Sequence, residues 1–546
     1  MSKLLNKKLL DKKILLLSLL LFGSYAHANK TLSETYNKEK TASLFQKNCA
    51  SCHGEDRLGL IGPPLIPTSF KRLKPKSAAM VIKKGRLSTQ MPAFEKMLSD
   101  KDINHLVEFI FKPLAVSPKW DLADIKKSHK VFYPKNTLPD TPSFKADMQN
   151  LFVVVELGDH HVTVLDGDSF KAITRFKTHN ALHGGPKYSS DGRYVYFASR
   201  DGWVTKYDLY NLKIIAEIRV GINTRNVAVS ADNKYVIVGN TLPHTAIILN
   251  ADNLSPIKLI PIISKQGISS RVSAVYTAAP RNSFILALKD IPEVWEIPYI
   301  DKPVFVHDYH YELPEYTGQK FSIRRLTLDN YLDDFFLSQD YRFIIGTARS
   351  LSINTDKKSR SKHKILGGQV IDLVIGKKIA ELDIAGMPHL SSGISWKYKP
   401  TGVDQTRVLA IPNIKDGSIS IFDMANWKKI KTIKTLGPGF FMRSHANSQY
   451  AWVDVFFGPD KDAMHIIDKQ KLEIVKTLRP TPGKTSAHVE FTKNGDFALL
   501  SIWDKDGELI IYNAKTLKEV KRLKMKKPSG KYNVYNKTHL EEGTSH

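Results

Sequence analysis

The chain has 546 residues, 81 Lys and Arg against 54 Asp and Glu, a formal net charge of +27 and two cysteines. Its length exceeds one average domain, and two cysteines in a chain of this size exclude a disulfide-stapled scaffold. The basic charge fits either an acidic or polyanionic partner or a solvated lysine-rich surface. Because the lysines are spread along the whole chain, no nucleic-acid partner is expected.

Residues 1–28 predict a secretory signal peptide. A basic stretch precedes the short apolar run "ILLLSLLLF", and "AHA" at 26–28 is a small-x-small cleavage site. The apolar run is short for a bilayer span, and an uncleaved membrane anchor is the alternative. We therefore expect export to the periplasm and no stable membrane insertion after cleavage.

Both cysteines lie in "NCASCHG", as Cys49 and Cys52, directly before His53. C-x-x-C-H is the attachment signature of c-type haem. Two thiols three positions apart on a helical turn reach the two haem vinyl groups, and the next residue places an imidazole beneath the iron. Zinc would need a second ligand pair, and the chain has no other cysteine. The motif predicts one covalent haem c, with His53 as an iron ligand.

Met91 in "STQMPAF" is the predicted sixth ligand of this haem, with Met80 and Met97 as alternatives. A thioether ligand raises the haem potential and suits electron transfer. "DKDINHLVEFIF" at 100–111 has apolar residues at helical spacing and predicts the closing helix. A small all-α cytochrome c domain is therefore expected over residues 35–115.

A proline-punctuated linker is expected at 116–148, followed by a repeat. Short β-rich runs are separated by turn signals such as "SSDGRY", "SADNKY", "SQDYRF" and "KNGDFA", in about eight copies. No single copy buries its own apolar face, and a ring of such units does. The pattern predicts an all-β, eight-bladed β-propeller over 149–536 with a tail at 537–546. A β-sandwich and a β-solenoid are the alternatives.

The haem c motif followed by this propeller resembles the cytochrome cd1 family over nearly the whole mature chain. The segments "ALHGGPKYSSDGRYVYFASRDGWV", "MPHLSSGISW", "SHANSQYAWVD" and "PSGKYNVYN" carry the resemblance. It implies that the propeller binds haem d1, or its dihydro precursor, without a covalent bond. It also implies a soluble periplasmic electron carrier and haem d1 biosynthesis proteins as partners. Reductases of this family are typically dimers, so a homodimer is an expectation.

The resemblance also implies roles for individual residues. His183 aligns with the proximal iron ligand of haem d1, and His389 with a distal-pocket histidine of catalytic role. His445 and Tyr532 lie in segments that approach the funnel, and we predict a catalytic role for His445 and cofactor binding for Tyr532. The predicted carboxylate-binding arginines are Arg200, Arg225 and Arg271, because guanidinium groups match carboxylates bidentately.

Two activities compete within the family. One is oxidation of dihydro-haem d1 to haem d1, and the other is reduction of nitrite to nitric oxide. The stretch 328–343, where the reductases carry a second distal histidine, has Asp333 and Asp334 and no histidine. This favours the dehydrogenase branch, with His389 as proton acceptor and haem c as electron acceptor. A propeller that only carries haem d1 is a further alternative, although a carrier needs no electron outlet.

Overall fold

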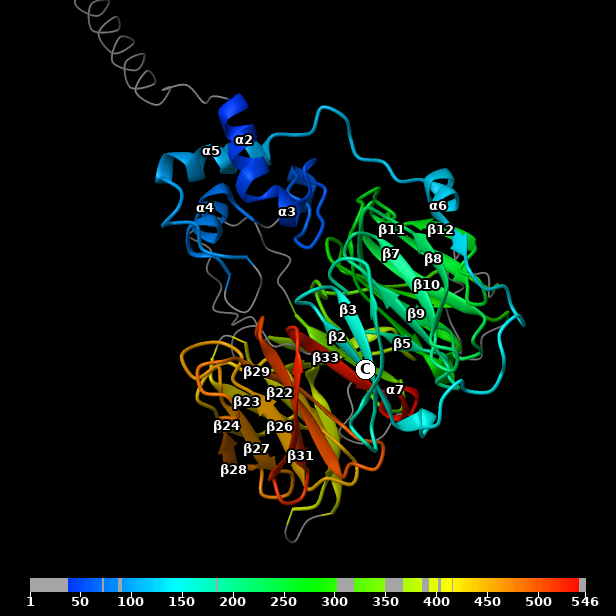
Figure 1. Cartoon of the computed structure of the whole chain (residues 1–546), viewed down its shortest axis with the longest axis vertical. Helices are drawn as coiled ribbons and strands as arrows, with labels where there is room; N and C mark the ends of the chain where they lie inside the picture. The colour runs from blue at the N-terminus through cyan, green and yellow to red at the C-terminus, as the bar shows by residue number, and fades with distance from the viewer. Residues whose placement is uncertain are drawn as a thin grey trace, which may run out of the picture. The chain divides into compact units, whose positions relative to one another are not determined.

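The computed structural model describes residues 38–70, 73–86, 91–182, 185–301, 319–348, 367–384, 392–400, 404–414 and 416–539. The predicted signal peptide and residues 540–546 of the predicted tail lie outside these ranges. The chain divides into two compact units, Met1–Arg57 with Leu65–Ala115, and Leu58–Pro64 with Val116–His546. Helices form the first unit and sheets dominate the second (Figure 1).

The first unit contains α2 (Lys38–Asn48), α3 (Ala50–His53), η1 (Pro67–Phe70), α4 (Pro75–Lys84) and α5 (Asp100–Phe111). The helix expected at 100–111 is confirmed as α5, which begins after Ser99 because the Ser99 hydroxyl accepts the Asp102 N–H at 3.1 Å. Its apolar face packs against α2 and α4. Within the described ranges, no helix has the length and apolarity that a membrane span requires.

The described part of the second unit forms eight antiparallel sheets. The first four, from the innermost strand outward, are β33 (Pro528–Asn533), β2 (Leu151–Glu156), β3 (His161–Asp166), β4 (Ala172–Lys177); β5 (Lys187–Tyr188), β6 (Tyr194–Ala198), β7 (Trp203–Asp208), β8 (Lys213–Arg219); β9 (Asn223–Val229), β10 (Tyr235–Leu242), β11 (Thr245–Asn250), β12 (Pro256–Pro261); and β13 (Val272–Ala278), β14 (Ser283–Leu288), β15 (Glu293–Pro298), β16 (Arg324–Thr327). The second also receives β1 (Lys130–Val131) beside β8.

The other four sheets follow in chain order. They are β17 (Phe335–Leu337), β18 (Phe343–Thr347), β19 (Gly368–Asp372), β20 (Lys377–Leu382); β21 (Ile394–Tyr398), β22 (Thr406–Pro412), β23 (Ser418–Asp423), β24 (Lys429–Lys434); β25 (Met442–Ser444), β26 (Tyr450–Asp454), β27 (Met464–Asp468), β28 (Glu473–Leu478); and β29 (Ser486–Phe491), β30 (Phe497–Ile502), β31 (Gly507–Asn513), β32 (Glu519–Met525). Short helices are α6 (Leu122–Ser128), η2 (Met148–Asn150), η3 (Ala279–Arg281) and α7 (Val534–Thr538).

The repeated turn signals form the same hydrogen-bonded turn between the first two strands of a blade. In "SSDGRY" the Ser189 hydroxyl donates to Asp191 at 2.5 Å and accepts the Tyr194 N–H at 2.9 Å. "SADNKY" repeats both bonds with Ser230, at 2.6 and 2.9 Å. The sequence signal therefore has a direct structural cause, because the serine and aspartate supply the turn's acceptors.

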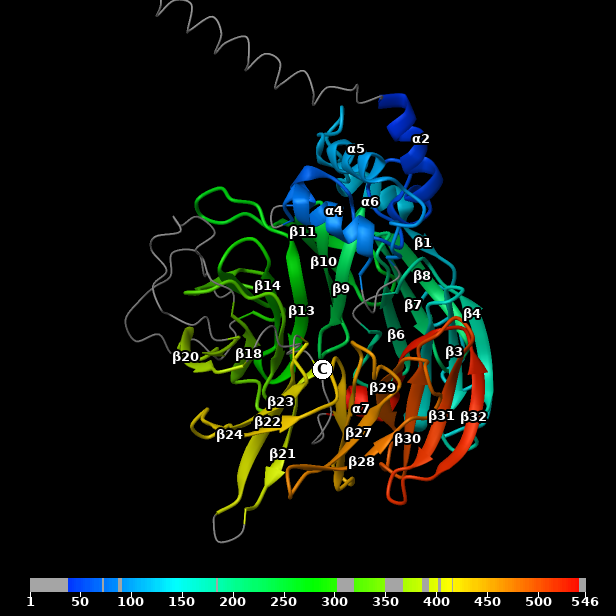
Figure 2. The same cartoon turned by 90° about the vertical axis from the view of Figure 1, so that its left-hand side faces the viewer.

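The ring closes where the two ends of the propeller chain meet. The C-terminal strand β33 pairs with β2, so that Val153 lies opposite Tyr532. The apolar faces of this first blade and of the last blade share one core, and Figure 2 shows the red strands of the last blade beside the cyan strands of the first. The predicted eight-bladed propeller is confirmed, and β33, β5, β9, β13, β17, β21, β25 and β29 are its innermost strands.

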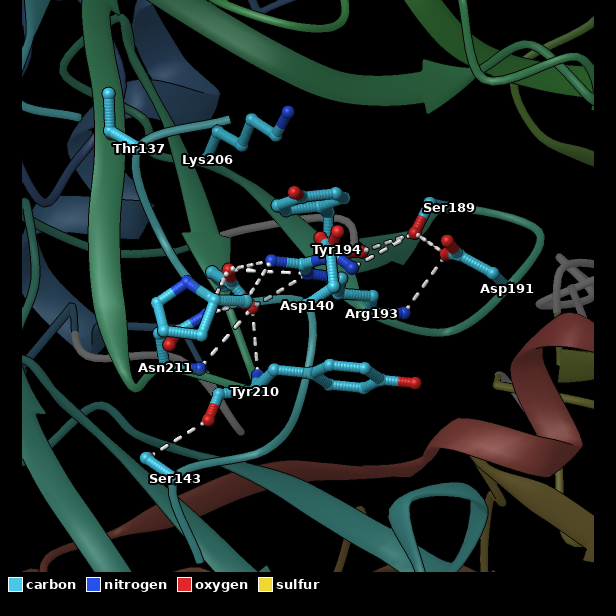
Figure 3. Close-up of polar contacts among 12 residues, drawn as sticks. Thr137, Asp140, Ser143, Ser189, Asp191, Arg193, Tyr194, Lys206, Tyr210 and Asn211 are labelled. Carbon is cyan, nitrogen blue, oxygen red and sulfur yellow. Dashed lines mark hydrogen bonds and ion pairs between the residues drawn. The ribbon is translucent and has the colours of Figure 1, made fainter. Parts of the chain in front are cut away.

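The segment expected as a linker carries ordered structure of its own. It contains α6 and β1, and the Trp120 indole N–H donates to the Arg219 carbonyl at 3.0 Å. Further along, Arg193 forms ion pairs with Asp140 at 2.6 Å and Asp208 at 3.0 Å (Figure 3). We call residues 120–150 the strap, since they are fastened to the second blade.

Candidate functional site

The haem-attachment motif forms one helical turn in the first unit. The Cys52 and His53 N–H groups both donate to the Cys49 carbonyl, at 3.1 and 2.9 Å, so the thiols and the imidazole belong to a single turn. His53 is buried, and both cysteines are free thiols. Burial, followed by the neighbouring Cys52, raises the pKa of the Cys49 thiol to about 11. The half-buried position of both cysteines fits thioether attachment of haem c, since a thioether carries no charge.

Met91 is half-buried against the same apolar core as Cys49. Met80 and Met97, the alternative sixth ligands, are 52 and 64% exposed. The Met91 carbonyl accepts the Arg86 N–H at 3.1 Å and lies so close to Gly85 that a Cβ there would approach it to 2.8 Å. Gly85 also has a positive φ of 72°, so glycine is needed there for both reasons. Burial favours Met91 among the three methionines.

A cluster of charged and aromatic side chains lies on the innermost strands of the propeller. We call it the axial cluster; it comprises Lys187, Arg443, His488, Glu490, Lys531, Tyr532 and Lys537. They come from β5, β25, β29, β33 and α7, which directly follows β33. Strand β5, from the second blade, meets the other elements because the ring closes.

Glu490 is the carboxylate of the axial cluster, which holds four basic side chains. Arg443 donates to Glu490 at 3.0 Å, and the Lys537 ammonium lies 4.0 Å from the same oxygen. Lys537 also lies 5.6 Å from the centre of the Tyr532 ring. With four basic groups around one carboxylate, the cluster is suited to a ligand that brings several negative charges.

The protonated forms of the three lysines in the axial cluster are disfavoured, and their pKa values are lowered. Burial, then Arg443, lowers the pKa of Lys187 to about 8. Burial also holds the pKa of Lys531 and of Lys537 well below the ordinary lysine range, against the opposing effect of Glu490. An anionic ligand would relieve this desolvation and mutual repulsion, because an opposite charge favours the protonated form.

His488 is the imidazole of the axial cluster. Its ring packs between Phe441, at 4.9 Å between ring centres, and Tyr532, at 5.5 Å. Its Nδ1 is buried and has no hydrogen-bond partner among the described residues. Burial, then Lys531, Arg443 and Lys537, holds the pKa of His488 well below its ordinary value. At neutral pH the imidazole is therefore uncharged.

Two of the predicted arginines lie near each other at the innermost strands. Arg225 projects from β9, where its Nε donates to the Ser273 carbonyl at 2.7 Å. Arg200 is half-buried, and burial, then the charge of Arg225, lowers its pKa to about 10. Among the described residues, no carboxylate forms an ion pair with Arg200. A ligand carboxylate beside Arg200 would offset the free-energy cost of burying its charged guanidinium.

Arg271 and His445 have other partners. Arg271 makes two hydrogen bonds to Asp290, at 2.8 and 2.7 Å. The His445 ring accepts the Asn447 N–H at 3.1 Å and lies 3.2 Å from the Lys493 carbonyl, which joins turns of two neighbouring blades. This geometry gives His445 a structural role and lends no support to its predicted catalytic role, which stays a prediction.

His183 and His389 lie outside the described residues. The described chain near His183 does reach the axial cluster. Gly185 has a φ of 69°, and a Cβ there would lie 3.0 Å from the Tyr532 ring. The predicted role of Tyr532 therefore gains a geometric basis, since Tyr532 contacts both this segment and His488.

Sequence reasoning did not single out six members of the axial cluster. A signal was present in the innermost strands, where a charged residue shortly precedes the turn signal, as Lys187 does in "PKYSSDG" and Glu490 in "VEFTKNG". His488 and Glu490 also share strand β29.

A c-type haem motif on a helical unit, joined to a propeller with a cationic centre, defines a two-part cytochrome that takes a second, polyanionic ligand. The Cytochrome D1 heme domain model matches residues 146–537, and the model for Cytochrome C oxidase, cbb3-type, subunit III matches residues 37–110. The chain belongs to the cytochrome d1 haem domain family.

Individual relatives agree with this assignment. The chain is 50% identical over 527 residues to the dihydro-heme d1 dehydrogenase of Pseudomonas aeruginosa, covering 96% of this chain and 98% of the relative. It is 26% identical to a nitrite reductase of Stutzerimonas stutzeri, covering 91% of this chain and 93% of the relative. A solved structure titled dihydro-heme d1 dehydrogenase NirN in complex with DHE has 51% identity and a TM-score of 0.74, covering 91% of this chain and 99% of that chain. The family resemblance predicted from the sequence is confirmed.

Proposed function

We propose that this protein oxidises dihydro-haem d1 to haem d1 and passes the electrons through haem c. The observation that carries the proposal is the axial cluster, which brings together four basic groups, an uncharged imidazole and the Glu490 carboxylate, with the Asp454 carboxyl beside Lys531 and His488. A tetrapyrrole with several carboxylates matches this charge, and its oxidation needs a proton acceptor beside it. The 50% identity to a dihydro-heme d1 dehydrogenase supports the same conclusion.

Lys187, Lys537, Arg200 and Arg225 would hold the carboxylates of the substrate. Each lies on or beside an innermost strand, and three of them have pKa values lowered by burial. Tyr532 would pack against the ring, and His183 would ligate its iron, as the family resemblance implies. Pairing buried cations with carboxylates converts a desolvation cost into charge-assisted hydrogen bonds.

Conversion of a propionate to an acrylate removes two electrons and two protons from one pair of neighbouring carbons. His389 is our first candidate for a proton acceptor, and Nδ1 of His488 is a second. Burial and the cations around His488 keep its imidazole uncharged before the reaction. Carboxylates of a bound substrate would offset these cations and raise the pKa of the imidazole again, so that its nitrogen could accept a proton. Haem c, held by Cys49, Cys52 and His53, supplies a one-electron outlet.

The signal-peptide pattern and the family resemblance also support a cellular location and partners for this protein. We propose a periplasmic location, because residues 1–28 form a signal-peptide pattern. A soluble electron carrier would accept the electrons, and haem d1 biosynthesis proteins would supply the substrate. A homodimer is proposed from the family resemblance.

The test is to load the purified protein with dihydro-haem d1 and follow its absorption spectrum, with nitrite turnover measured in parallel. We expect conversion to haem d1 and slow nitrite turnover. His389→Ala is expected to bind the substrate and lose most of the conversion. Fast nitrite turnover without conversion would replace the proposal by nitrite reduction.

A further inference from the structure

His488 occupies an unusual backbone position. It is the residue at which the pairing of β29 with β30 shifts register, between Ala487 and Val489, and its φ is 48°. The left-handed region is sterically unfavourable for a residue other than glycine. Such a conformation persists only where the surroundings impose it.

Two buried charged residues from other strands hold the backbone of His488. The Asp454 carboxylate, at the end of β26, accepts the His488 N–H at 3.3 Å. The Lys531 ammonium, on β33, donates to the His488 carbonyl and to the Ser501 hydroxyl. Asp454 and Lys531 are both 0% exposed. The peptide groups on both sides of His488 are therefore fixed from the two flanking blades.

The Asp454 carboxylate also positions Phe441, whose ring packs against one side of the His488 imidazole. The other oxygen of Asp454 accepts the Phe440 N–H at 2.7 Å and the Phe441 N–H at 3.0 Å. The Phe441 ring lies against His488, and the opposite wall is Tyr532, the neighbour of Lys531. Asp454 thus joins the histidine backbone and an aromatic neighbour through three N–H groups.

We propose that Asp454 is a positioning residue that acts through His488 and fixes the direction of its imidazole toward the substrate. This rests on the proposed function, in which His488 accepts a proton. Three N–H donors suit a carboxylate with two acceptor oxygens, whereas an amide turns an NH₂ group toward one of those donors. Burial raises the pKa of the Asp454 carboxyl to about 7, although these N–H groups and the charge of Lys531 oppose the rise.

The first experiment is a double-mutant cycle with Asp454→Asn and His488→Ala in the full-length protein. Because the side chain of Asp454 is 0% exposed and is proposed to act through His488, Asp454→Asn is expected to lower kcat about ten- to a hundredfold and to leave KM within about twofold. In the His488→Ala background the same change should cause no further loss of kcat. An equal loss in both backgrounds would overturn the proposal and leave Asp454 a structural residue.

Asp372→Asn is the matched control. Asp372 is also a buried aspartate at a strand end, where it accepts the Val374 N–H at 2.8 Å, but it lies on the third strand of its blade. It should lower stability without changing kcat. A loss of kcat as large as that of Asp454→Asn would also count against the proposal. Asp454→Ser is the second variant, because its hydroxyl retains one acceptor in a smaller volume.

A readout without turnover separates this proposal from the proposed function. Diethyl pyrocarbonate modifies accessible imidazoles, and the rate at His488 can be mapped by mass spectrometry before dihydro-haem d1 is added. The rate is expected to rise several-fold in Asp454→Asn and to stay unchanged in Asp372→Asn. An unchanged rate in Asp454→Asn overturns the positioning role. A raised rate in a protein whose wild type converts no dihydro-haem d1 would overturn the function and retain the positional link.

Discussion

Arg443 donates to Glu490 at 3.0 Å between two innermost strands, and the two side chains are only 4 and 1% exposed. The pair alone is neutral, but Lys187, Lys531 and Lys537 surround it. Glu490 therefore reduces the repulsion among the basic side chains at the centre of the propeller before a ligand binds. The ligand adds negative charge to a site that already holds one carboxylate.

Glu490→Gln is expected to lower the free energy of unfolding of the ligand-free protein by about 3–5 kcal/mol, because it leaves a buried guanidinium without its carboxylate. Haem d1 should then stabilise the variant more than the wild type, since its carboxylates replace the lost charge. Thermal unfolding with and without haem d1 measures both effects.

Glu296→Gln is the control for that comparison. Glu296 is 0% exposed and pairs with Arg281 and Arg324 at 2.8 and 2.9 Å, within the blade of β13–β16. It should show a similar loss of stability with no extra gain from haem d1. Equal gains from haem d1 in Glu490→Gln and the wild type would contradict the role assigned to Glu490.

Lys187 predicts a pH dependence of ligand affinity. Its pKa of about 8 in the ligand-free protein lies below its ordinary value of 10.5, with Arg443, Lys537 and the Tyr276 ring facing it. A bound carboxylate raises this pKa again, so that binding takes up a proton above about pH 8. Affinity for haem d1 should therefore weaken as the pH rises from about 8 toward 10.

The measurement is the Kd of haem d1 against pH in the wild type and in Lys187→Met. The variant should bind more weakly and lose this part of the pH dependence. Lys187 affects the free energy of unfolding in the opposite direction. The ligand-free protein loses stability as the pH falls from 10.5 to about 8, because the folded state disfavours the protonated lysine. A parallel pH slope in both proteins would assign the dependence to another group.

The blade repeat could be predicted from sequence because its turns are local. Ser189, Asp191 and Tyr194 lie within one turn, and their hydrogen bonds are made by neighbouring residues. The haem c motif is local for the same reason, since Cys49, Cys52 and His53 share one helical turn.

The axial cluster could not be predicted in that way. Lys187 and Lys531 are 344 positions apart in the numbering, and they come together only through ring closure. Family resemblance directed attention to arginines and histidines and to Tyr532, whose ring centre lies 5.5 Å from that of His488. It did not distinguish His445, whose ring is occupied by backbone groups, from His488, whose Nδ1 has no partner among the described residues.

Met91→Leu is expected to lower the reduction potential of haem c, because loss of a thioether ligand removes a group that raises it. Met80→Leu and Met97→Leu, at the two exposed positions, should leave the potential unchanged. A redox titration of the three variants followed by visible absorption makes the comparison. A potential that shifts in Met97→Leu and not in Met91→Leu would move the sixth ligand to Met97.

The strap is expected to contribute to the stability of the propeller through Arg193. Its guanidinium pairs with Asp140 of the strap (Figure 3) and with Asp208 of β7, which is 1% exposed. Arg193→Leu leaves that buried carboxylate without its cation, and the free energy of unfolding should fall by about 3 kcal/mol. Proteolysis within residues 131–147 should become faster, because the strap loses an anchor.

Lys135→Leu provides the comparison, since Lys135 also joins the strap to a blade, by an ion pair of 2.9 Å with Asp252. These side chains are 67 and 45% exposed, so water screens the pair and its loss should cost less than about 1 kcal/mol. Chemical denaturation of both variants measures the difference. Equal losses would show that Arg193 holds the strap no more firmly than a surface pair does.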